Sequence, residues 1–197
     1  MTPELKTEFK RKIFHLLSLV YLGVYLSLGR WNAAIAIGAW FVIVTIVEWI
    51  RLRNPSLNEW LMAFFGGIHR EKEMHKMSGI VWTTLGCLAT ITLFGDRPRV
   101  VSAGILFLAL GDGVAALAGR AWGTHKWPGL DGKKSVEGSL ACFLACLVSG
   151  FAVGLNPVAT VAGAFAGTVF ELFPVPIDDN LWLPLLSAGV VAFFSPI

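Results

Sequence analysis

The sequence predicts an all-α integral membrane protein, a polytopic helical bundle with about seven transmembrane helices in a single domain over residues 1–197. Its composition is 55% hydrophobic and only 15% charged, whereas an average soluble domain carries about 25% charged residues. Apolar runs close to the length that crosses a bilayer recur along the chain. The basic residues concentrate between certain runs. A soluble enzyme, a disordered chain and a nucleic-acid-binding protein are therefore disfavoured, and we expect no nucleic-acid partner.

The seven apolar runs are the predicted membrane spans. They cover approximately residues 13–29, 31–47, 79–95, 100–119, 136–155, 157–173 and 181–194. Some are near the short end of the range for a helix that crosses the hydrocarbon core, which takes about 20 residues. The first run follows a basic stretch and resembles a secretory signal. Because a second apolar run begins at once, we interpret the first as a retained anchor.

The distribution of lysine and arginine predicts a cytoplasmic N-terminus. Of the 16 basic residues, all but Arg30, Arg97 and Arg99 then fall in cytoplasmic segments. An excess of basic residues in short cytoplasmic loops is the positive-inside pattern. We therefore expect a multi-pass protein of the cell inner membrane or the endoplasmic reticulum, with its active site facing the cytoplasm.

A short helix is predicted near residues 56–65, in the second cytoplasmic segment. Asn54 precedes Pro55, which disfavours continuation of the preceding helix, and Ser56 stands three residues before Glu59, as in a capping box. The apolar stripe of this helix comprises Leu57, Trp60, Leu61, Phe64 and Phe65. We interpret it as a helix in the membrane interface. A cytoplasmic helix packed on the bundle fits the pattern equally well.

Asp112 is predicted to lie well inside the fourth span, between Gly111 and Gly113. An aspartate at the centre of a membrane helix costs about 2.5–3.5 kcal/mol on insertion scales, so such a residue is expected to be functional. The two glycines weaken the helix and allow another backbone or a ligand to approach closely. The alternative is a structural role, in which Asp112 pairs with an arginine or bonds between helices.

Other acidic residues are predicted to gather at the same cytoplasmic end. They are Glu48, Glu137, Glu171, Asp178 and Asp179, and only Asp96 falls on the far side. This grouping predicts a pocket at the cytoplasmic interface, open to water-soluble reactants. An ion-coupled transporter using Asp112 and Glu171 is the alternative, but transporters place polar groups near the midplane in related halves, and the sequence shows no repeat.

The segment from Gly132 to Glu137 is predicted to bind phosphate. Ser135 is placed to cap the fifth span, whose N-terminus offers unpaired N–H groups to an anion. Lys133 and Lys134 directly before it strengthen an anion site. Glu137 repels phosphate unless a cation bridges them, and Mg²⁺ binds through one or two carboxylates plus phosphate oxygens. Lysines that serve only as cytoplasmic anchors are the alternative.

A longer motif contains these residues and resembles the CTP-binding region of the dolichol kinase/phytol kinase family. It runs Asp112-x-x-Ala115-x-x-x-Gly119-x-x-x-Gly123 and then, after a spacer, Lys133-Lys134-Ser135-x-Glu137-Gly138. That family comprises polytopic CTP-dependent lipid kinases, related to phosphatidate cytidylyltransferases. The Arg11-Lys12 and His15 opening, Glu48 with Arg51, and Asp178-Asp179-Asn180 also resemble family features.

The resemblance implies transfer of the γ-phosphoryl group of CTP, assisted by Mg²⁺, to the hydroxyl of a lipid alcohol. The acceptor is a polyprenol or dolichol, phytol, a similar isoprenoid alcohol, or diacylglycerol. The expected partners are CTP, this lipid alcohol and membrane lipids, while the oligomeric state stays open. A cytidylyltransferase, which attacks the α-phosphate and releases pyrophosphate, is the nearest alternative. The longer acidic signature of phosphatidate cytidylyltransferases is not seen, which favours the kinase.

The resemblance also implies roles for individual residues. The nucleotide-binding set is Gly119, Arg120, Gly123, Gly132, Lys133, Lys134 and Ser135. The metal-binding set is Asp112, Glu137, Asp178 and Asp179. The catalytic set is Asp112 and Lys133, with Asp179 or Glu48 binding a second ion or activating the lipid hydroxyl. On their own, small residues such as Gly119 and Gly123 are more typical of helix-packing faces.

Overall fold

The computed structural model describes residues 9, 12, 15–64, 74–130, 132, 134–173 and 177–195. Within them the regular elements are helices, accompanied by an isolated antiparallel bridge between Lys126 and Ser135. The all-α prediction is confirmed. The helices are α2 (Ser18–Arg53), α3 (Pro55–Phe64), α4 (Gly79–Phe94), α5 (Pro98–Leu106), η2 (Phe107–Asp112), α6 (Gly113–Trp122), α7 (Val136–Ala152), α8 (Pro157–Leu172) and α9 (Asp179–Phe194).

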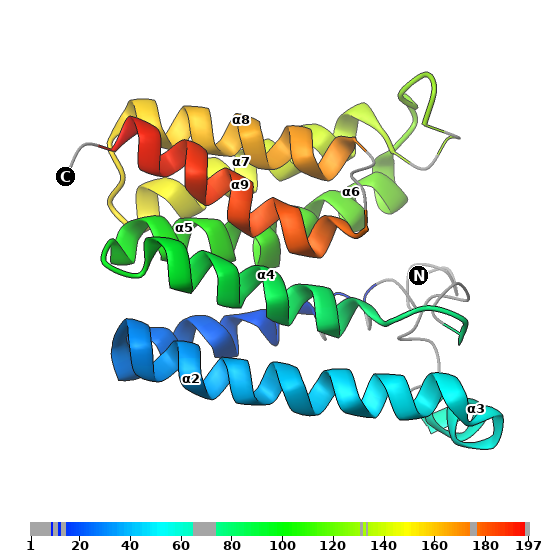
Figure 1. Cartoon of the computed structure of the whole chain (residues 1–197). Coiled ribbons are helices and arrows are strands. Elements are labelled where there is room, and N and C mark those ends of the chain that lie inside the picture. The colour runs from blue at the N-terminus through cyan, green and yellow to red at the C-terminus, as the bar shows by residue number, and fades with distance from the viewer. Residues whose placement is uncertain are drawn as a thin grey trace.

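Helix α2 is a hairpin that holds the first two predicted spans. Gly29 has φ 74° and ψ 178°, which interrupts the helix. A positive φ of this size favours glycine because it has no Cβ. The two halves lie antiparallel (Figure 1), and the Trp40 Nε1 donates to the Tyr21 hydroxyl across them at 3.1 Å. The second half continues to Arg53, beyond the predicted end at residue 47.

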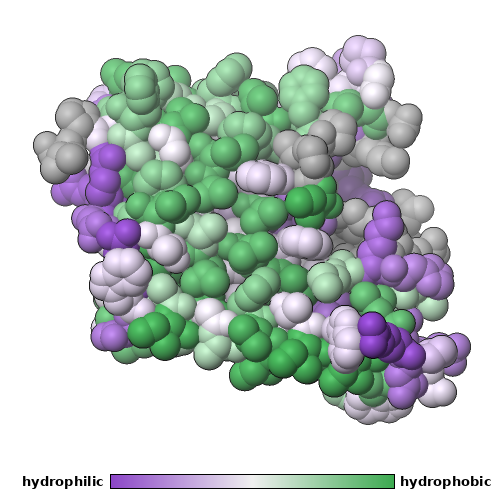
Figure 2. Space-filling model, in the orientation of Figure 1, coloured by the Kyte–Doolittle hydropathy of each residue, from purple (hydrophilic) through white to green (hydrophobic). Residues whose placement is uncertain are grey.

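The apolar surface (Figure 2) and two long helical stretches are typical of a membrane bundle. Two apolar stretches, Ser18–Arg53 and Pro98–Trp122, are long enough to cross a bilayer, and the second is continuous through α5, η2 and α6. The apolar helices α4, α7, α8 and α9 are shorter. Figure 2 shows an apolar band between polar groups at two opposite ends of the molecule. The structure thus supports a membrane bundle, while seven crossings and a cytoplasmic N-terminus stay predictions.

The chain reversals create two ends that we name by their residues (Figure 1). The α3 end contains α3, the N-termini of α4, α7 and α9, and the C-termini of α6 and α8. The Gly29 end contains the α2 turn, the α4–α5 and α7–α8 turns and the C-terminus of α9. Among the described residues, the predicted site residues lie at or near the α3 end.

Helix α3 confirms the predicted short helix, with a different cap. Its first residue is Pro55, and the Asn54 Oδ1 accepts from the Leu57 N–H at 3.2 Å, so the cap is Asn54 rather than Ser56. Proline suits the first helical position because it lacks an N–H group. Trp60 and Phe64 stack with 5.6 Å between ring centroids and are both exposed. This exposed aromatic pair favours the interfacial position, which stays a prediction.

Candidate functional site

Asp112 is buried at the end of a π-helical turn, η2, in the middle of a long apolar segment. Single π turns inside α-helices occur frequently at functional sites. Its Oδ2 accepts from the Lys12 Nζ at 2.5 Å and lies 3.3 Å from the His15 Nε2. Both partners come from the N-terminal segment. Asp112 is therefore paired, with a lysine in place of the arginine named in the structural alternative, and its role in the reaction stays a prediction.

His15 attaches the same segment to the π turn. Its Nε2 lies 3.2 Å from the Leu108 carbonyl oxygen as well as 3.3 Å from the Asp112 carboxylate. The Lys12 side chain is only 6% exposed. A buried lysine without a partner is costly, so Lys12 and Asp112 each compensate the desolvation of the other.

Lys134 forms a second ion pair close to the first. Its Nζ donates to the Glu171 carboxylate and, at 2.7 Å, to the Glu171 carbonyl oxygen. The Glu171 side chain is 4% exposed and that of Lys134 is 30% exposed. Burial alone lowers the pKa of Lys134, but the charges of Glu171, Asp112 and Asp179 outweigh this and raise it. Lys134 therefore interacts electrostatically with carboxylates from η2, α8 and α9.

These side chains form one group, which we call the acid–lysine cluster. It comprises Lys12, His15, Asp112, Lys134, Glu171 and Asp179. Its members come from five segments that are far apart in the sequence. Charges interact strongly where the surroundings are poorly solvated, so a cluster with both signs can bind an anion and a cation together.

Ser135 caps α7 as predicted, and its Oγ accepts from the Gly138 N–H at 3.1 Å. The prediction of unpaired N–H groups at this terminus is not met at Val136, whose N–H donates to the His125 carbonyl at 2.9 Å. The bridge between Lys126 and Ser135 brings that carbonyl close. A phosphate at this terminus therefore depends on lysine side chains more than on the helix backbone.

The rest of the predicted lysine loop is only partly described. Lys133 lies outside the described residues, so its predicted role is untested. Gly132 is exposed and has φ 67°, a left-handed conformation that suits glycine. Arg120 is exposed in the last turn of α6. The nucleotide contacts of all three stay predictions.

Glu137 contacts the turn that follows α6. Its carboxylate accepts from the Thr124 hydroxyl at 2.8 Å and the His125 N–H at 3.1 Å, and lies 2.7 Å from the His125 Nδ1. The side chain is 26% exposed. These contacts hold the turn after α6 against α7. A role of Glu137 as a metal ligand stays a prediction.

The glycines of the motif lie in the contact between α6 and α7. A Cβ on Gly123 would stand 2.5 Å from the Ser135 Oγ, and one on Gly138 would stand 2.9 Å from the Ala115 carbonyl oxygen. A Cβ on Gly119 would stand 3.2 Å from the same Ser135 Oγ. The small residues therefore allow the two helices to pack closely and hold Ser135 in place. Contacts of Gly119 and Gly123 with a nucleotide stay predictions.

Glu48 belongs to a separate buried network. Its Oε1 accepts from the Arg51 Nε at 3.0 Å, and its Oε2 accepts from the Arg51 Nη2 and the Ser78 N–H, both at 2.7 Å. Arg51 also donates to the Lys76 carbonyl at 3.0 Å. These bonds tie α2 to the start of α4. They favour an architectural role, and the predicted catalytic role of Glu48 stays untested.

The two aspartates before and in the first turn of α9 differ in their surroundings. The Asp178 Oδ1 caps the helix and accepts from the Asn180 N–H at 3.1 Å and the Asn180 Nδ2 at 2.7 Å. Asp179 is the first residue of α9, and its charge acts on Lys134. Of the two, Asp179 is the one joined to the acid–lysine cluster.

A fully formed metal cage is not seen: within the described ranges, no group of three or more His, Cys, Asp or Glu residues could hold a metal ion. Mg²⁺ in a nucleotide site requires less, because it takes one or two protein carboxylates together with phosphate oxygens and water. Asp112 and Asp179 both act on the charge of Lys134, and their role as ligands of Mg²⁺ stays a prediction.

Sequence reasoning missed two members of the cluster. Lys12 was assigned only to the basic segment and to a family-like opening, and Glu171 received no role in the predicted kinase site. A usable signal was present, because a buried aspartate requires a cation and Lys12 stands one helical turn before His15. Lys134 and Glu171 lie in segments that are far apart in the sequence, so no local sequence pattern indicates that they pair.

Several known proteins that are similar to this chain are named as lipid kinases. CTP-dependent diacylglycerol kinase 1 of Saccharomyces cerevisiae is 30% identical over 93% of this chain and 72% of its own length. The phytol kinase of Synechocystis is 33% identical over 92% of this chain and 77% of its own. Dolichol kinase EVAN of Arabidopsis thaliana is 28% identical over 89% of this chain and 33% of its own. No family model matches the chain, and no solved structure matches it.

Proposed function

The chain belongs to the dolichol kinase/phytol kinase family of CTP-dependent lipid kinases, and we propose that it phosphorylates a membrane lipid alcohol from CTP at the cytoplasmic interface. The proposed acceptor is an isoprenoid alcohol, such as a polyprenol, dolichol or phytol, or diacylglycerol. The observation that carries the proposal is the acid–lysine cluster, in which Asp112 and Lys134 of the recognised motif act on each other at one end of an apolar bundle.

The proposed membrane arrangement gives both substrates access to the cluster. Seven helical spans, with the N-terminus in the cytoplasm, place the α3 end at the inner headgroup layer. CTP reaches this end from water. The tail of the alcohol lies along the apolar helices, so its hydroxyl stands at the depth of the buried Asp112. The whole chain then acts as one integral membrane domain of the inner membrane or the endoplasmic reticulum.

In phosphoryl transfer the protein mainly positions the reactants and neutralises charge on the phosphate oxygens. We assign Lys134, together with Lys133, to oxygens of the triphosphate. The side chain of Lys134 is 30% exposed and so reaches the edge of the cluster. Its raised pKa keeps it protonated at neutral pH. Ser135 holds the loop by capping α7, and Gly132 and Arg120 complete the proposed nucleotide contacts.

The carboxylates of the cluster are the proposed ligands of Mg²⁺, which when bound neutralises charge on the phosphate oxygens. Asp112 and Asp179 are the favoured pair because both act on Lys134. Glu137 and Asp178 are retained as lesser candidates, because each makes hydrogen bonds to groups outside the acid–lysine cluster. Asp179 is also the proposed group that accepts the proton of the lipid hydroxyl. Lys12 holds Asp112 ionised in its buried position.

The reaction type is tested by incubating membranes that contain the protein with γ-labelled CTP, Mg²⁺, a mixture of lipid alcohols and phosphatidate, the phosphorylated lipid that a cytidylyltransferase requires. Transfer of label to lipid, with release of CDP, supports the kinase. Label released as pyrophosphate shows a cytidylyltransferase instead. Without turnover on any alcohol the proposal fails, and ion transport becomes the function to examine.

A further inference from the structure

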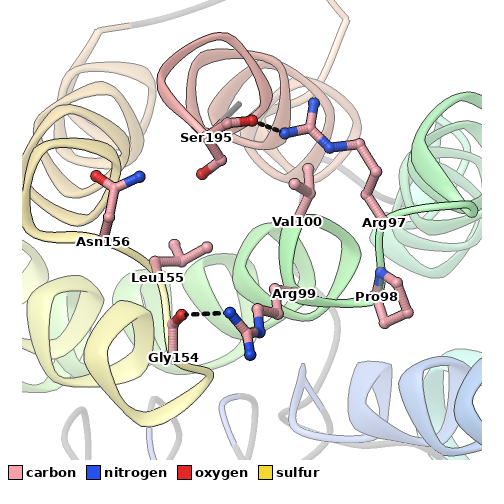
Figure 3. A pocket seen from close by; sticks show the side chains of 8 residues that line it. All are labelled: Arg97, Pro98, Arg99, Val100, Gly154, Leu155, Asn156 and Ser195. Carbon is pink, nitrogen blue, oxygen red and sulfur yellow. Dashed lines mark hydrogen bonds between the residues drawn. The ribbon is translucent and has the colours of Figure 1, made fainter. Parts of the chain in front are cut away.

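A cavity of about 510 Å³ lies at the Gly29 end, opposite the acid–lysine cluster (Figure 3). It is formed where the α4–α5 turn, the α7–α8 turn and the end of α9 meet. The residues used below line it: Arg97, Arg99, Val100, Gly154, Leu155 and Ser195. Its lining contains two arginines and no acidic residue.

Both arginines already donate to backbone carbonyl groups at helix ends. Arg97 donates to the Ala192 carbonyl at 2.9 Å and to the Ser195 carbonyl, and the Arg99 Nη1 donates to the Gly154 carbonyl at 3.2 Å. A guanidinium group has five N–H donors, so each keeps donors for a ligand. Within the part of the chain that the structure describes, neither has a carboxylate partner. The Asp96 carboxylate at this end pairs with Arg30.

Two further features make the cavity favourable for an anion. The helices α5 and α8 begin at its wall, each with a proline in the first turn, and α5 begins without a side-chain cap. The positive ends of two helix dipoles therefore face the same space. The Ser195 Oγ is buried and has no hydrogen-bond partner among the described residues, which leaves a hydroxyl donor at the cavity wall.

Capping of helix ends explains the hydrogen bonds that Arg97 and Arg99 donate to carbonyl groups. It does not explain the cavity beside these two cationic side chains. Arg99 is exposed and makes a single hydrogen bond of 3.2 Å, so its guanidinium is available. Val100 and Leu155 supply an apolar wall next to it. Cationic and apolar groups together match a phosphodiester attached to a lipid better than a fully hydrated ion.

We infer that this cavity binds the phosphate group of an anionic phospholipid in the leaflet facing the Gly29 end. The two guanidinium groups bind the phosphate oxygens, and the Ser195 hydroxyl donates to the headgroup. This inference rests on the proposed membrane arrangement, but not on the chemistry at the α3 end. The two can therefore fail separately.

The test is native mass spectrometry of the purified chain in detergent with equal amounts of phosphatidylglycerol and phosphatidylcholine. The protein is expected to retain phosphatidylglycerol in preference. Arg99→Gln is expected to weaken that retention about ten-fold, the loss typical of one charge-assisted hydrogen bond. Arg97→Gln/Arg99→Gln should remove the preference. A melting temperature near that of the unchanged protein shows that Arg99→Gln folds.

The matched control is Arg30→Gln, which removes the same charge at the same end but does not line the cavity. It should keep the preference for phosphatidylglycerol. Equal loss in Arg30→Gln and Arg99→Gln, or equal retention of the two lipids by the unchanged protein, overturns the site. A second arm adds inorganic phosphate to lipid-free protein. If inorganic phosphate raises the melting temperature but phosphatidylglycerol is not retained, the cavity is assigned to free phosphate and the phospholipid proposal is overturned.

Discussion

Two buried charge networks at the α3 end differ in how they are built. Glu48 and Arg51 are three residues apart on one helix, and they also bond to the Asn58 side chain, the Ser78 N–H and the Lys76 carbonyl. In the acid–lysine cluster, Lys12 and Asp112 are 100 residues apart, and Lys134 reaches Glu171 from a loop. The first network is local and well satisfied, whereas the second brings distant segments together and is partly open.

From this difference we infer that the Glu48 network stabilises the fold and that the acid–lysine cluster serves the reaction. A closed ion pair holds helices together but has few donors or acceptors left for a ligand. The Lys134 side chain is 30% exposed, against 2% for Arg51. We therefore expect changes in the acid–lysine cluster to remove catalysis, and changes in the Glu48 network to lower stability. Each prediction below tests one side of this contrast.

The largest expected effect belongs to Asp112→Asn. Loss of this carboxylate removes the proposed metal ligand, so kcat should fall at least about 100-fold, as when a group that stabilises transition-state charge is removed. The measurement is lipid phosphorylation from γ-labelled CTP, normalised to inserted protein. Asp96→Asn, an exposed aspartate at the other end, is the control and should stay near normal.

Because Asp112→Asn leaves Lys12 buried without its partner, the same change can also lower stability. Lys12→Met combined with Asp112→Asn removes both charges and should recover the melting temperature. Activity should stay lost in that double variant. Recovery of activity together with stability would mean that Asp112 serves only the fold.

Lys133→Ala and Lys134→Ala come next. Each removes a proposed triphosphate contact, so kcat/KM for CTP should fall by about 10–100-fold, the size expected for a charged hydrogen bond of about 1.5–3 kcal/mol. Lys126→Ala is the matched control because it removes an exposed lysine from the same loop region. Steady-state kinetics at varied CTP concentrations measure kcat/KM for Lys133→Ala, Lys134→Ala and Lys126→Ala. Equal losses in all of them would indicate a general effect of positive charge.

Glu48→Gln should change stability rather than chemistry. It leaves the Arg51 guanidinium buried without its counter-ion, and breaking such a pair costs about 3 kcal/mol. Thermal unfolding in detergent measures the loss. Turnover per folded molecule should stay within about two-fold of normal, a difference of less than 1 kcal/mol in the barrier. A normal melting temperature with lost turnover would restore Glu48 to the catalytic set.

The smallest expected effect concerns pH. The Lys134 pKa lies above the ordinary lysine value, so Lys134 is fully protonated at neutral pH. The stabilisation is present below the lysine pKa of the unfolded chain and disappears only as pH rises through the raised pKa. The kcat/KM for CTP should therefore show no lysine deprotonation between pH 7 and 9. A decline in that range that Lys134→Arg abolishes contradicts the assignment.

The sequence predicted the helical class, and each of the seven predicted apolar runs overlaps a helix of the structure, because hydrophobic runs and glycine or proline breaks are local signals. It located Asp112 and the Ser135 cap for the same reason. It did not predict Lys12 as the partner of Asp112 or Glu171 as the partner of Lys134, since those pairs depend on how helices meet. It also predicted unpaired N–H groups at the start of α7, where a loop carbonyl binds the Val136 N–H.

The most direct measurement is binding of Mn²⁺, in place of Mg²⁺, by electron paramagnetic resonance in the presence and absence of CTP. We expect the unchanged protein and Glu48→Gln to bind the ion only together with CTP. Asp112→Asn should lose this CTP-dependent signal. Undiminished binding of Mn²⁺ and CTP by Asp112→Asn, or its loss in Glu48→Gln alone at a temperature where that variant is folded, would contradict the account.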